Sequence, residues 1–282
     1  MRIARLISPT GDTVLARIEN GVAEPLAFQL DHPRSDVLID LLDRDVDITR
    51  LTAVAAPFSV ADAEWCAPVT WPSKIIAVGL NYADHAREAN LDLPTAPMIF
   101  AKYPNSLAAH GDPIVYRTSN SIQVDYESEL AIIIGRRTFE VGIDTALDSV
   151  LGYTICNDVS ARDAQFADKQ FTRAKSFNTF CPLGPTLVTA DEIADPQRLR
   201  IASRVNGVTV QDSTTAEMIF SIAELISYLS RVMTLEVGDV ITTGTPAGVG
   251  MAKVPPLYLV DGDVVEVEIE GLGILSNPVQ QL

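Results

Sequence analysis

Short segments in which apolar and polar residues alternate recur along the chain and predict that β-strands dominate its fold. Residues 2–7 and 13–18 are two such segments, and the turn-forming residues 9–12 between them predict a hairpin. Strand-like segments also fill most of the C-terminal third, where residues 264–269 and 273–275 form the last pair. The pattern therefore predicts a β-rich protein.

Apolar residues at the helical period predict two amphipathic helices among these strands, over residues 35–43 and 219–233. A shorter helix is predicted to begin at Ala83. Three prolines mark residues 55–73 as a connection between a small N-terminal domain and the rest of the chain. The sequence thus predicts one domain over residues 1–70 and a second over residues 71–282.

Two glutamates stand at the start of a continuous apolar run, where burial of their charge would cost free energy. Residues 130–134 are apolar, rich in β-branched side chains and bounded by Gly135, as in a strand buried on both faces. Residues two apart in a strand point to the same face, so Glu127 and Glu129 would lie side by side. Two close carboxylates raise each other's pKa or recruit a cation. The alternative is an exposed strand end with two solvated glutamates.

A second strand-like run, residues 151–156, ends in Asn157-Asp158. A third carboxylate, delivered by Asp158 from a neighbouring strand end, would complete a site made of oxygen ligands alone. Magnesium, manganese and calcium accept such sites.

The helix predicted from Ala83 would place His85 and Glu88 on one face, because they are three residues apart. A histidine oriented by a carboxylate is the usual equipment of a general base. The alternative on spacing alone is a solvated pair on a surface helix.

Polar residues also follow the third carboxylate. Ser160 is a candidate cap for a helix that would place Arg162 and Gln165 on one face near Asp158. Lys175 is either an ordinary surface residue or, beside a metal, a charge that neutralises a carboxylate or an enolate. The glycine-rich residues 242–250 can hold a carboxylate on backbone N–H groups, although they lack the ending of a P-loop.

Composition and charge narrow the function classes. The chain has 282 residues, 47% of them hydrophobic, and a formal net charge of −16, which argues against nucleic acid and anionic membranes as partners. An anionic substrate would need local cations. No apolar run is long enough to span a membrane, and the first residues lack a signal-peptide core, so we expect a cytoplasmic protein. Three cysteines without zinc-type spacing are expected to be reduced and packed.

Five fragments, in this order, closely resemble the fumarylacetoacetate hydrolase family: VGLNYADHAREA, DYESELAIIIGR, GYTICNDVSARDAQ, RAKSFNTFCPLGP and GDVITTGTPAGVG. The resemblance covers residues 71–282. It implies an α+β, β-rich fold, a roll of mixed sheets with peripheral helices, that is active as a homodimer. The N-terminal segment resembles the small extra domain of the bacterial hydrolase, isomerase and decarboxylase branches.

The resemblance also implies roles for individual residues. The ligands of Mg²⁺ or Mn²⁺, with Ca²⁺ as an alternative, would be Glu127, Glu129 and Asp158. The catalytic residues would be His85, Glu88 and Lys175, with His85 and Glu88 on a mobile lid, and substrate contacts would come from Arg162, Gln165 and Thr245. Asn178 stands where many relatives have aspartate, which weakens transfer of a specific substrate.

The implied substrate is a small anionic 2-oxo acid that chelates the metal, which stabilises an enolate. Hydrolysis of an acylpyruvate or fumarylacetoacetate, decarboxylation of an oxaloacetate-like acid and keto–enol or hydroxymuconate-type isomerisation all pass through that enolate. Hydrolysis is favoured because the histidine–glutamate pair can activate water. A non-catalytic metal- or 2-oxo-acid-binding homologue is the alternative of another class, and the intact set of catalytic residues argues against it.

Overall fold

The computed structural model describes residues 1–29 and 36–282. The predicted N-terminal hairpin is confirmed by β1 (Arg2–Ile7) and β2 (Thr13–Glu19), and β3 (Val22–Phe28) extends it. The predicted helix over residues 35–43 corresponds to α1 (Val37–Leu42), and Ser35 lies outside the described residues. Asp36 caps α1, because its side chain accepts from two backbone N–H groups of the first turn.

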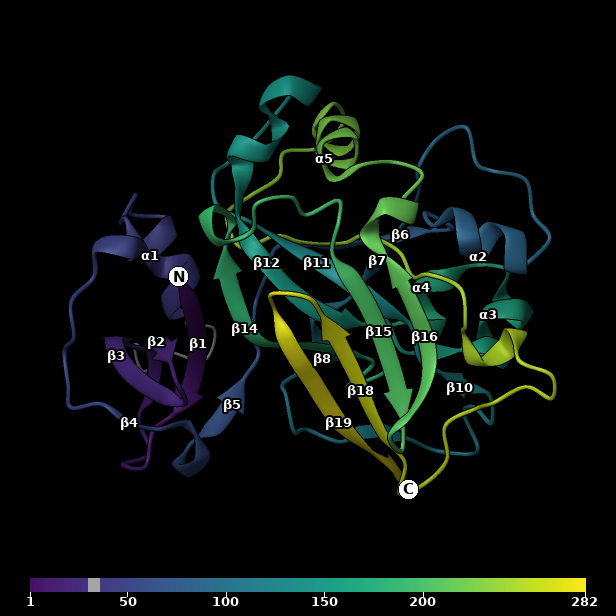
Figure 1. Cartoon of the computed structure of the whole chain (residues 1–282), viewed down its shortest axis with the longest axis horizontal. Coiled ribbons are helices and arrows are strands. Elements are labelled where there is room, and N and C mark those ends of the chain that lie inside the picture. The colour runs from purple at the N-terminus through teal and green to yellow at the C-terminus, as the bar shows by residue number, and fades with distance from the viewer. Residues whose placement is uncertain (30–35) are drawn as a thin grey trace.

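The proline-rich connection contains two short strands, β4 (Phe58–Ser59) and β5 (Glu64–Cys66). β5 pairs with β1, and β1 in turn pairs with β14 (Cys181–Thr189). The N-terminal strands, drawn in purple at the left of Figure 1, therefore belong to the same hydrogen-bonded sheet as later strands.

Within the described residues this sheet has twelve strands, and ten of them follow the order β4-β3-β2-β1-β14-β12-β11-β17-β6-β7. Its further strands are β12 (Val150–Asn157), β11 (Ser128–Ile134), β17 (Val240–Thr242), β6 (Ile75–Gly79), β7 (Met98–Lys102) and β8 (Leu107–Ala108), which pairs with β14. Every residue of β11 is buried, as its apolar run predicted, because β11 lies between β12 and β17.

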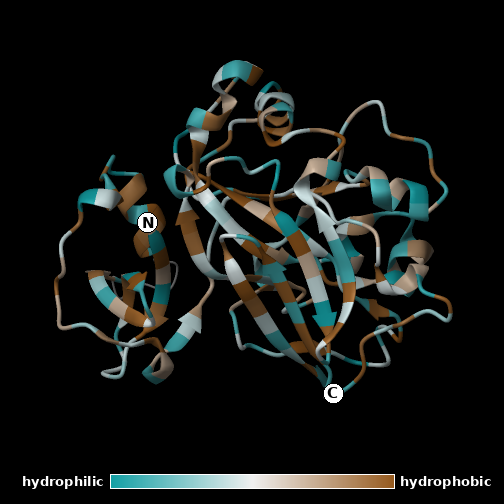
Figure 2. Ribbon diagram, viewed as in Figure 1, coloured by the Kyte–Doolittle hydropathy of each residue, from teal (hydrophilic) through white to brown (hydrophobic). Residues whose placement is uncertain are grey.

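A second sheet of five strands packs against the first. It consists of β16 (Val208–Thr214), β15 (Arg200–Val205), β18 (Val264–Ile269), β19 (Gly273–Gln281) and β9 (Ile114–Tyr116). Leu130 and Ile132 of β11 share a hydrophobic core with Ile201 and Val267 of this sheet, and brown, hydrophobic segments recur along the central strands in Figure 2. Burial of these apolar side chains is the main force that holds the two layers together. Parallel and antiparallel pairs coexist, so the sheets are mixed as expected.

Three short helices gather at one side of the roll, at the right of Figure 1: α2 (Ala83–Glu88), α3 (Arg162–Asp168) and α4 (Phe171–Ala174). Before α3, β13 (Ser160–Ala161) pairs with β10 (Val124–Asp125). The predicted cap at Ser160 is wrong, because Ser160 is in β13 and its hydroxyl donates to the carbonyl of Asp158.

The longer predicted helix is confirmed as α5 (Ile222–Ser230), which begins at a capping box formed by Ser221 and Glu224. The remaining helical segments in the described part of the chain are 3-10 turns at Ile48–Arg50, Val60–Asp62, Pro104–Ser106, Ile143–Ser149, Ala190–Glu192, Thr215–Glu217 and Gly250–Ala252. The cysteines are free, and Cys156 and Cys181 are buried. The molecule is an α+β, β-rich protein.

Candidate active site

Three carboxylates converge where β11 begins and β12 ends. These strands are antiparallel, with Glu129 opposite Cys156, so the start of one lies beside the end of the other. Glu127, Glu129 and Asp158 are buried there, and one carboxylate oxygen from each lies within 4.8 Å of the others. The structure thus brings together the three predicted metal ligands.

The backbone holds these carboxylates in place. Glu127 lies between β10 and β11 rather than inside the long strand. Its N–H donates to Oδ1 of Asn157 at 3.0 Å, and its carbonyl accepts from the N–H of Asp158 at 2.9 Å. These two bonds tie the segments that carry Glu127 and Asp158 to each other.

Two buried lysines compensate part of this negative charge. Nζ of Lys175 donates to Oε2 of Glu127 at 2.7 Å and to Oδ2 of Asp158 at 2.6 Å. Nζ of Lys102 donates to Oδ1 of Asp158 at 2.6 Å and to the carbonyl of Phe180 at 3.0 Å. No role was predicted for Lys102 from the sequence.

Glu129 is the carboxylate that lacks such a partner. Among the described residues, none of the ion pairs involves Glu129, and its Oε2 accepts from the N–H of Gly244 at 2.9 Å. Burial, together with the negative charges of Asp158 and Glu127, holds the pKa of Glu129 well above that of an ordinary glutamate. The reverse holds for Glu127, where Lys175 and Arg162 outweigh burial and lower the pKa.

The donor set therefore fits a divalent cation. Three carboxylates without sulfur or nitrogen ligands suit Mg²⁺, Mn²⁺ or Ca²⁺. A cation at this position would also supply the positive charge that the buried Glu129 lacks.

Arg162, at the start of α3, connects this centre to the neighbouring loop. Its Nη2 lies 2.6 Å from Oε1 of Glu127, and its Nε donates to Oδ2 of Asp125 at 2.9 Å. Asp125 also accepts from the N–H groups of Gly250 and Met251, at 2.7 and 3.0 Å. Sequence reasoning missed Asp125, because these partners are more than thirty residues away in the chain and the spacing gives no signal.

The predicted pair on α2 is present. Nδ1 of His85 lies 3.2 Å from Oε2 of Glu88, and Oε1 of Glu88 accepts from the N–H of Gly248 at 2.9 Å. Although partial burial opposes it, hydrogen bonds from His85 and Gly248 lower the pKa of Glu88. Asp84 anchors the same helix, since its Oδ2 accepts from the hydroxyl of Ser213 at 2.5 Å.

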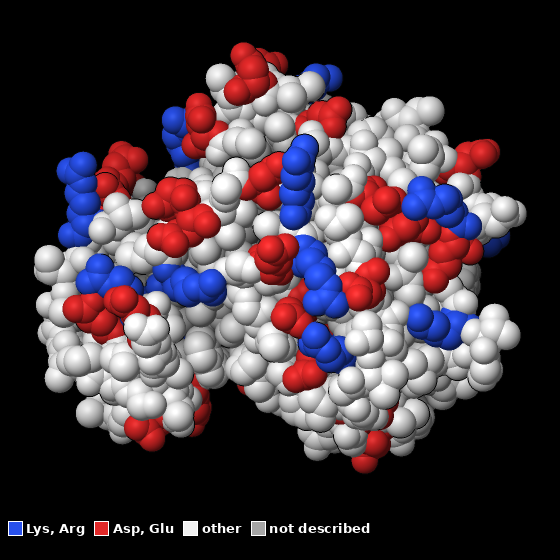
Figure 3. All heavy atoms as spheres, viewed as in Figure 1, with Lys and Arg blue, Asp and Glu red and all other residues white. Residues whose placement is uncertain are grey.

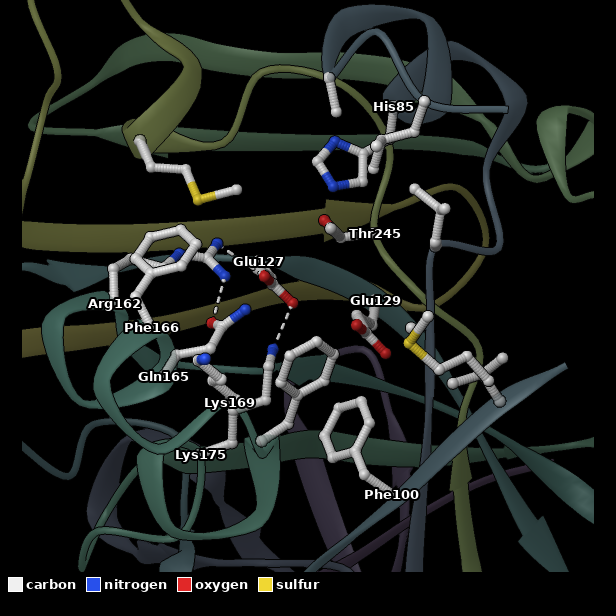
Figure 4. Close-up of a pocket in the computed structure, with 18 residues that line it drawn as sticks. His85, Phe100, Glu127, Glu129, Arg162, Gln165, Phe166, Lys169, Lys175 and Thr245 are labelled. Atoms are coloured by element: carbon white, nitrogen blue, oxygen red, sulfur yellow. Dashed lines mark hydrogen bonds and ion pairs between the residues drawn. The ribbon is translucent and has the colours of Figure 1, made fainter. Parts of the chain in front are cut away.

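Thr245 lies at the opposite wall of the site from Lys175 (Figure 4). Gln211 holds it in place. Nε2 of Gln211 donates to Oγ1 of Thr245 at 2.8 Å, and its Oε1 accepts from the N–H of Ser128 at 3.0 Å. The hydroxyl proton of Thr245 is therefore free to point to another acceptor. Gln211 was not predicted, because an isolated glutamine in a strand carries no motif.

These groups surround one cavity of about 330 Å³. Figure 4 shows His85, Glu127, Glu129, Gln165 and Thr245 around it. Its apolar wall consists of Val78, Leu80, Leu91, Met98, Phe100, Phe166, Phe171 and Met251. Asn178 lies away from it, where its Oδ1 accepts from Asn105 at 2.9 Å.

Lys and Arg side chains are interspersed with Asp and Glu on the face shown in Figure 3, without a continuous basic patch. Among the described residues, none of the helices has the length and apolar character needed to cross a membrane.

The fold and site define a β-roll protein with a buried acidic centre that faces a small cavity. Residues 74–280 match the family described as fumarylacetoacetate (FAA) hydrolase C-terminal. The chain therefore belongs to the fumarylacetoacetate hydrolase family, as the sequence motifs indicated.

Individual relatives are enzymes that act on small acids. A mitochondrial oxaloacetate tautomerase of Bos taurus is 46% identical over 265 residues, which are 92% of this chain and 84% of the relative. Oxaloacetate tautomerase YisK of Bacillus subtilis is 45% identical over 225 residues, 79% of this chain and 75% of the relative. Maleylpyruvate hydrolase from Sphingobium sp. SYK-6, solved with manganese(II) and pyruvate, is 30% identical with a TM-score of 0.82, covering 100% and 99% of the two chains.

Proposed function

We propose that this protein is a metal-dependent enzyme that moves a proton at the carbon beside the keto group of a 2-oxo dicarboxylic acid, with oxaloacetate as the model substrate. The proposal rests on the position of His85. Its ring faces the acidic centre across the cavity, and Nδ1 of the ring contacts Glu88. The similarity to two oxaloacetate tautomerases supports proton transfer as the reaction.

Glu127, Glu129 and Asp158 would hold Mg²⁺ or Mn²⁺. A bound divalent metal would act as a Lewis acid toward the 2-oxo group and favour its enolate form. The manganese in the maleylpyruvate hydrolase structure supports this choice of cofactor. Lys175 contacts Glu127 and Asp158, lowers the pKa of Glu127 and adds a positive charge beside the position where enolate charge would develop.

His85 would be the general base and acid. When Nδ1 of the neutral His85 ring carries the proton and donates it in a hydrogen bond to Glu88, Nε2 is left as the proton acceptor. Nε2 would remove a proton from the carbon beside the keto group, and delivery of a proton to the keto oxygen would complete the conversion to the enol. In the reverse direction the oxygen would lose its proton and the carbon would regain one from the His85 ring. Glu88, fixed by the N–H of Gly248, would orient the ring and stabilise its protonated form.

Gln165 and Thr245 would hold the substrate carboxylate that lies next to the keto group. Oε1 of Gln165 accepts from Nη1 of Arg162 at 3.0 Å, so the amide NH₂ group is left to donate. The free hydroxyl proton of Thr245 provides a second donor. Both residues line the cavity.

Hydrolysis of a carbon–carbon bond is a second candidate, since the same His85–Glu88 pair can activate water and a maleylpyruvate hydrolase shares the fold. A panel of oxaloacetate, an acylpyruvate, fumarylpyruvate and a hydroxymuconate-type diacid, assayed with Mg²⁺, with Mn²⁺ and with chelator, separates the reactions. The proposal predicts metal-dependent keto–enol conversion of oxaloacetate without cleavage. Faster cleavage of the acylpyruvate would favour the hydrolase, and no activity on any substrate would favour a binding protein.

A further inference from the structure

The charges around the cavity set a limit on what the site can bind. Four buried carboxylates, Asp125, Glu127, Glu129 and Asp158, face three buried cations, Lys102, Arg162 and Lys175. A divalent metal would change this excess of one negative charge into an excess of one positive charge. One carboxylate of a 2-oxo acid would balance that charge, so a second carboxylate needs another cation.

Lys169 is such a cation. It lines the cavity and is exposed, and no ion pair or side-chain hydrogen bond of the described residues involves it. The other cations of the lining, Arg162 and Lys175, are already paired with carboxylates. Because the protein carries a net charge of −16, an incoming anion has few other sources of attraction.

The position of Lys169 follows from the helical period. Arg162, Gln165 and Lys169 are three and four residues apart, so they follow one face of α3 from its start to its C-cap. Their exposure increases in that order, from 2% for Arg162 and 9% for Gln165 to the exposed Lys169. This face of α3 therefore leads from the acidic centre to the mouth of the cavity (Figure 4).

We infer that Lys169 is a specificity-determining residue that binds the second carboxylate of a 2-oxo dicarboxylic acid at the mouth of the cavity. The inference rests on the proposed function, because it assumes that the first carboxylate and the keto group lie at the acidic centre. Lys169 takes no part in proton transfer, so it acts on substrate affinity and on the choice between diacids and monoacids.

Calorimetric measurement of ligand affinity for the manganese-loaded protein tests this assignment. The two ligands are oxaloacetate, which has a second carboxylate, and 2-oxobutyrate, which lacks it. Lys169→Ala should weaken oxaloacetate binding by roughly tenfold, as expected for one lost charge-assisted hydrogen bond, and change 2-oxobutyrate binding by less than about twofold. In turnover of oxaloacetate, the same variant should raise KM by a similar factor and leave kcat within about twofold.

Arg136→Ala is the matched control. Arg136 is exposed and follows the end of β11 that lies away from Glu129. Its replacement by alanine removes one positive charge, as Lys169→Ala does, but leaves the cavity lining unchanged. Equal weakening of both ligands by Lys169→Ala, or equal effects of the two variants, would overturn the inference. A parent protein that binds oxaloacetate more tightly than 2-oxobutyrate but does not convert it would refute the proposed function while leaving Lys169 testable by binding.

Discussion

Single residues divide the chemistry of the cavity between its two sides. Lys175 contacts two carboxylates of the acidic centre, whereas the ring of His85 contacts Glu88 and lines the open cavity. Lys175 is therefore placed to stabilise negative charge, and His85 is placed to transfer a proton. Their removal should therefore have different consequences.

His85→Ala should lower kcat by about 10²–10⁴-fold, the usual cost of losing a positioned acid or base, and leave binding of oxalate nearly unchanged. Lys175→Ala should weaken oxalate binding as well as turnover, because it removes a charge that both the enolate and oxalate use. Steady-state kinetics and oxalate inhibition of the two variants measure this. Turnover of His85→Ala within a few-fold of the parent would mean that the pair is structural.

Glu129 should couple metal binding to pH. Its pKa is raised in the metal-free folded protein, so its stabilising contribution is present below the ordinary pKa of 4.5 and is lost as pH rises through the raised value. A metal ion competes with that proton. The increase in thermal midpoint caused by Mn²⁺ should therefore grow with pH, and Glu129→Gln should abolish most of it. A metal-induced shift that is independent of pH would contradict this account.

The members of the acidic centre were predictable, because the sequence places Glu127 and Glu129 two residues apart at a strand end and Asp158 at the end of another strand. The reason for their approach was only partly predicted, since Glu127 lies just outside β11 and is positioned by backbone bonds to Asn157 and Asp158. Asp125 and Gln211 were not predictable. Each acts through partners that only the folded sheets bring near, such as the N–H of Gly250 and the hydroxyl of Thr245.

At the scale of elements, α2 is tied to the rest of the site by polar side-chain contacts, among them an ion pair between Arg87 and Glu217 at 2.9 Å. Glu88 accepts from the N–H of Gly248, and Asp84 accepts from the hydroxyl of Ser213. Leu91 and Leu93, which follow the helix, are exposed. Such a segment is suited to open and close over a substrate.

We expect residues 82–93 to exchange amide hydrogens faster without ligand than with oxalate and Mn²⁺. Asp84→Ala should increase that exchange in the free protein, because it removes the bond to Ser213. Hydrogen exchange followed by mass spectrometry measures both effects, with β11 as the internal reference. Equal exchange of residues 82–93 in the free and bound states would refute a gating role.

Strand and helix positions were largely predictable, since the alternation of β1 and β2 and the helical period of α5 are strong local signals. The pairing of the strands was not. β1 lies against β14, some 180 residues away, and local periodicity carries no information on such a partner.

The pairing of β1 with β14 couples the N-terminal strands to the rest of the molecule. Ile3 of β1 is buried in one core with Leu183 and Leu187 of β14, and Ile3 lies opposite Leu187 in the sheet. The N-terminal segment and the roll should therefore unfold together. Ile3→Ala should lower the free energy of unfolding by about 2–5 kcal/mol and retain a single transition in denaturant. Two separate transitions in the parent protein would show that the segments are energetically independent.

Proton exchange on oxaloacetate tests most directly whether the assembled centre moves a proton on a 2-oxo acid. In deuterated water, the manganese- or magnesium-loaded protein should accelerate replacement of the protons beside the keto group, as followed by NMR. Chelator, Glu129→Gln and His85→Ala should each reduce the exchange to near the uncatalysed rate. Exchange that persists in His85→Ala, or cleavage of substrate without exchange in the parent protein, would contradict the account.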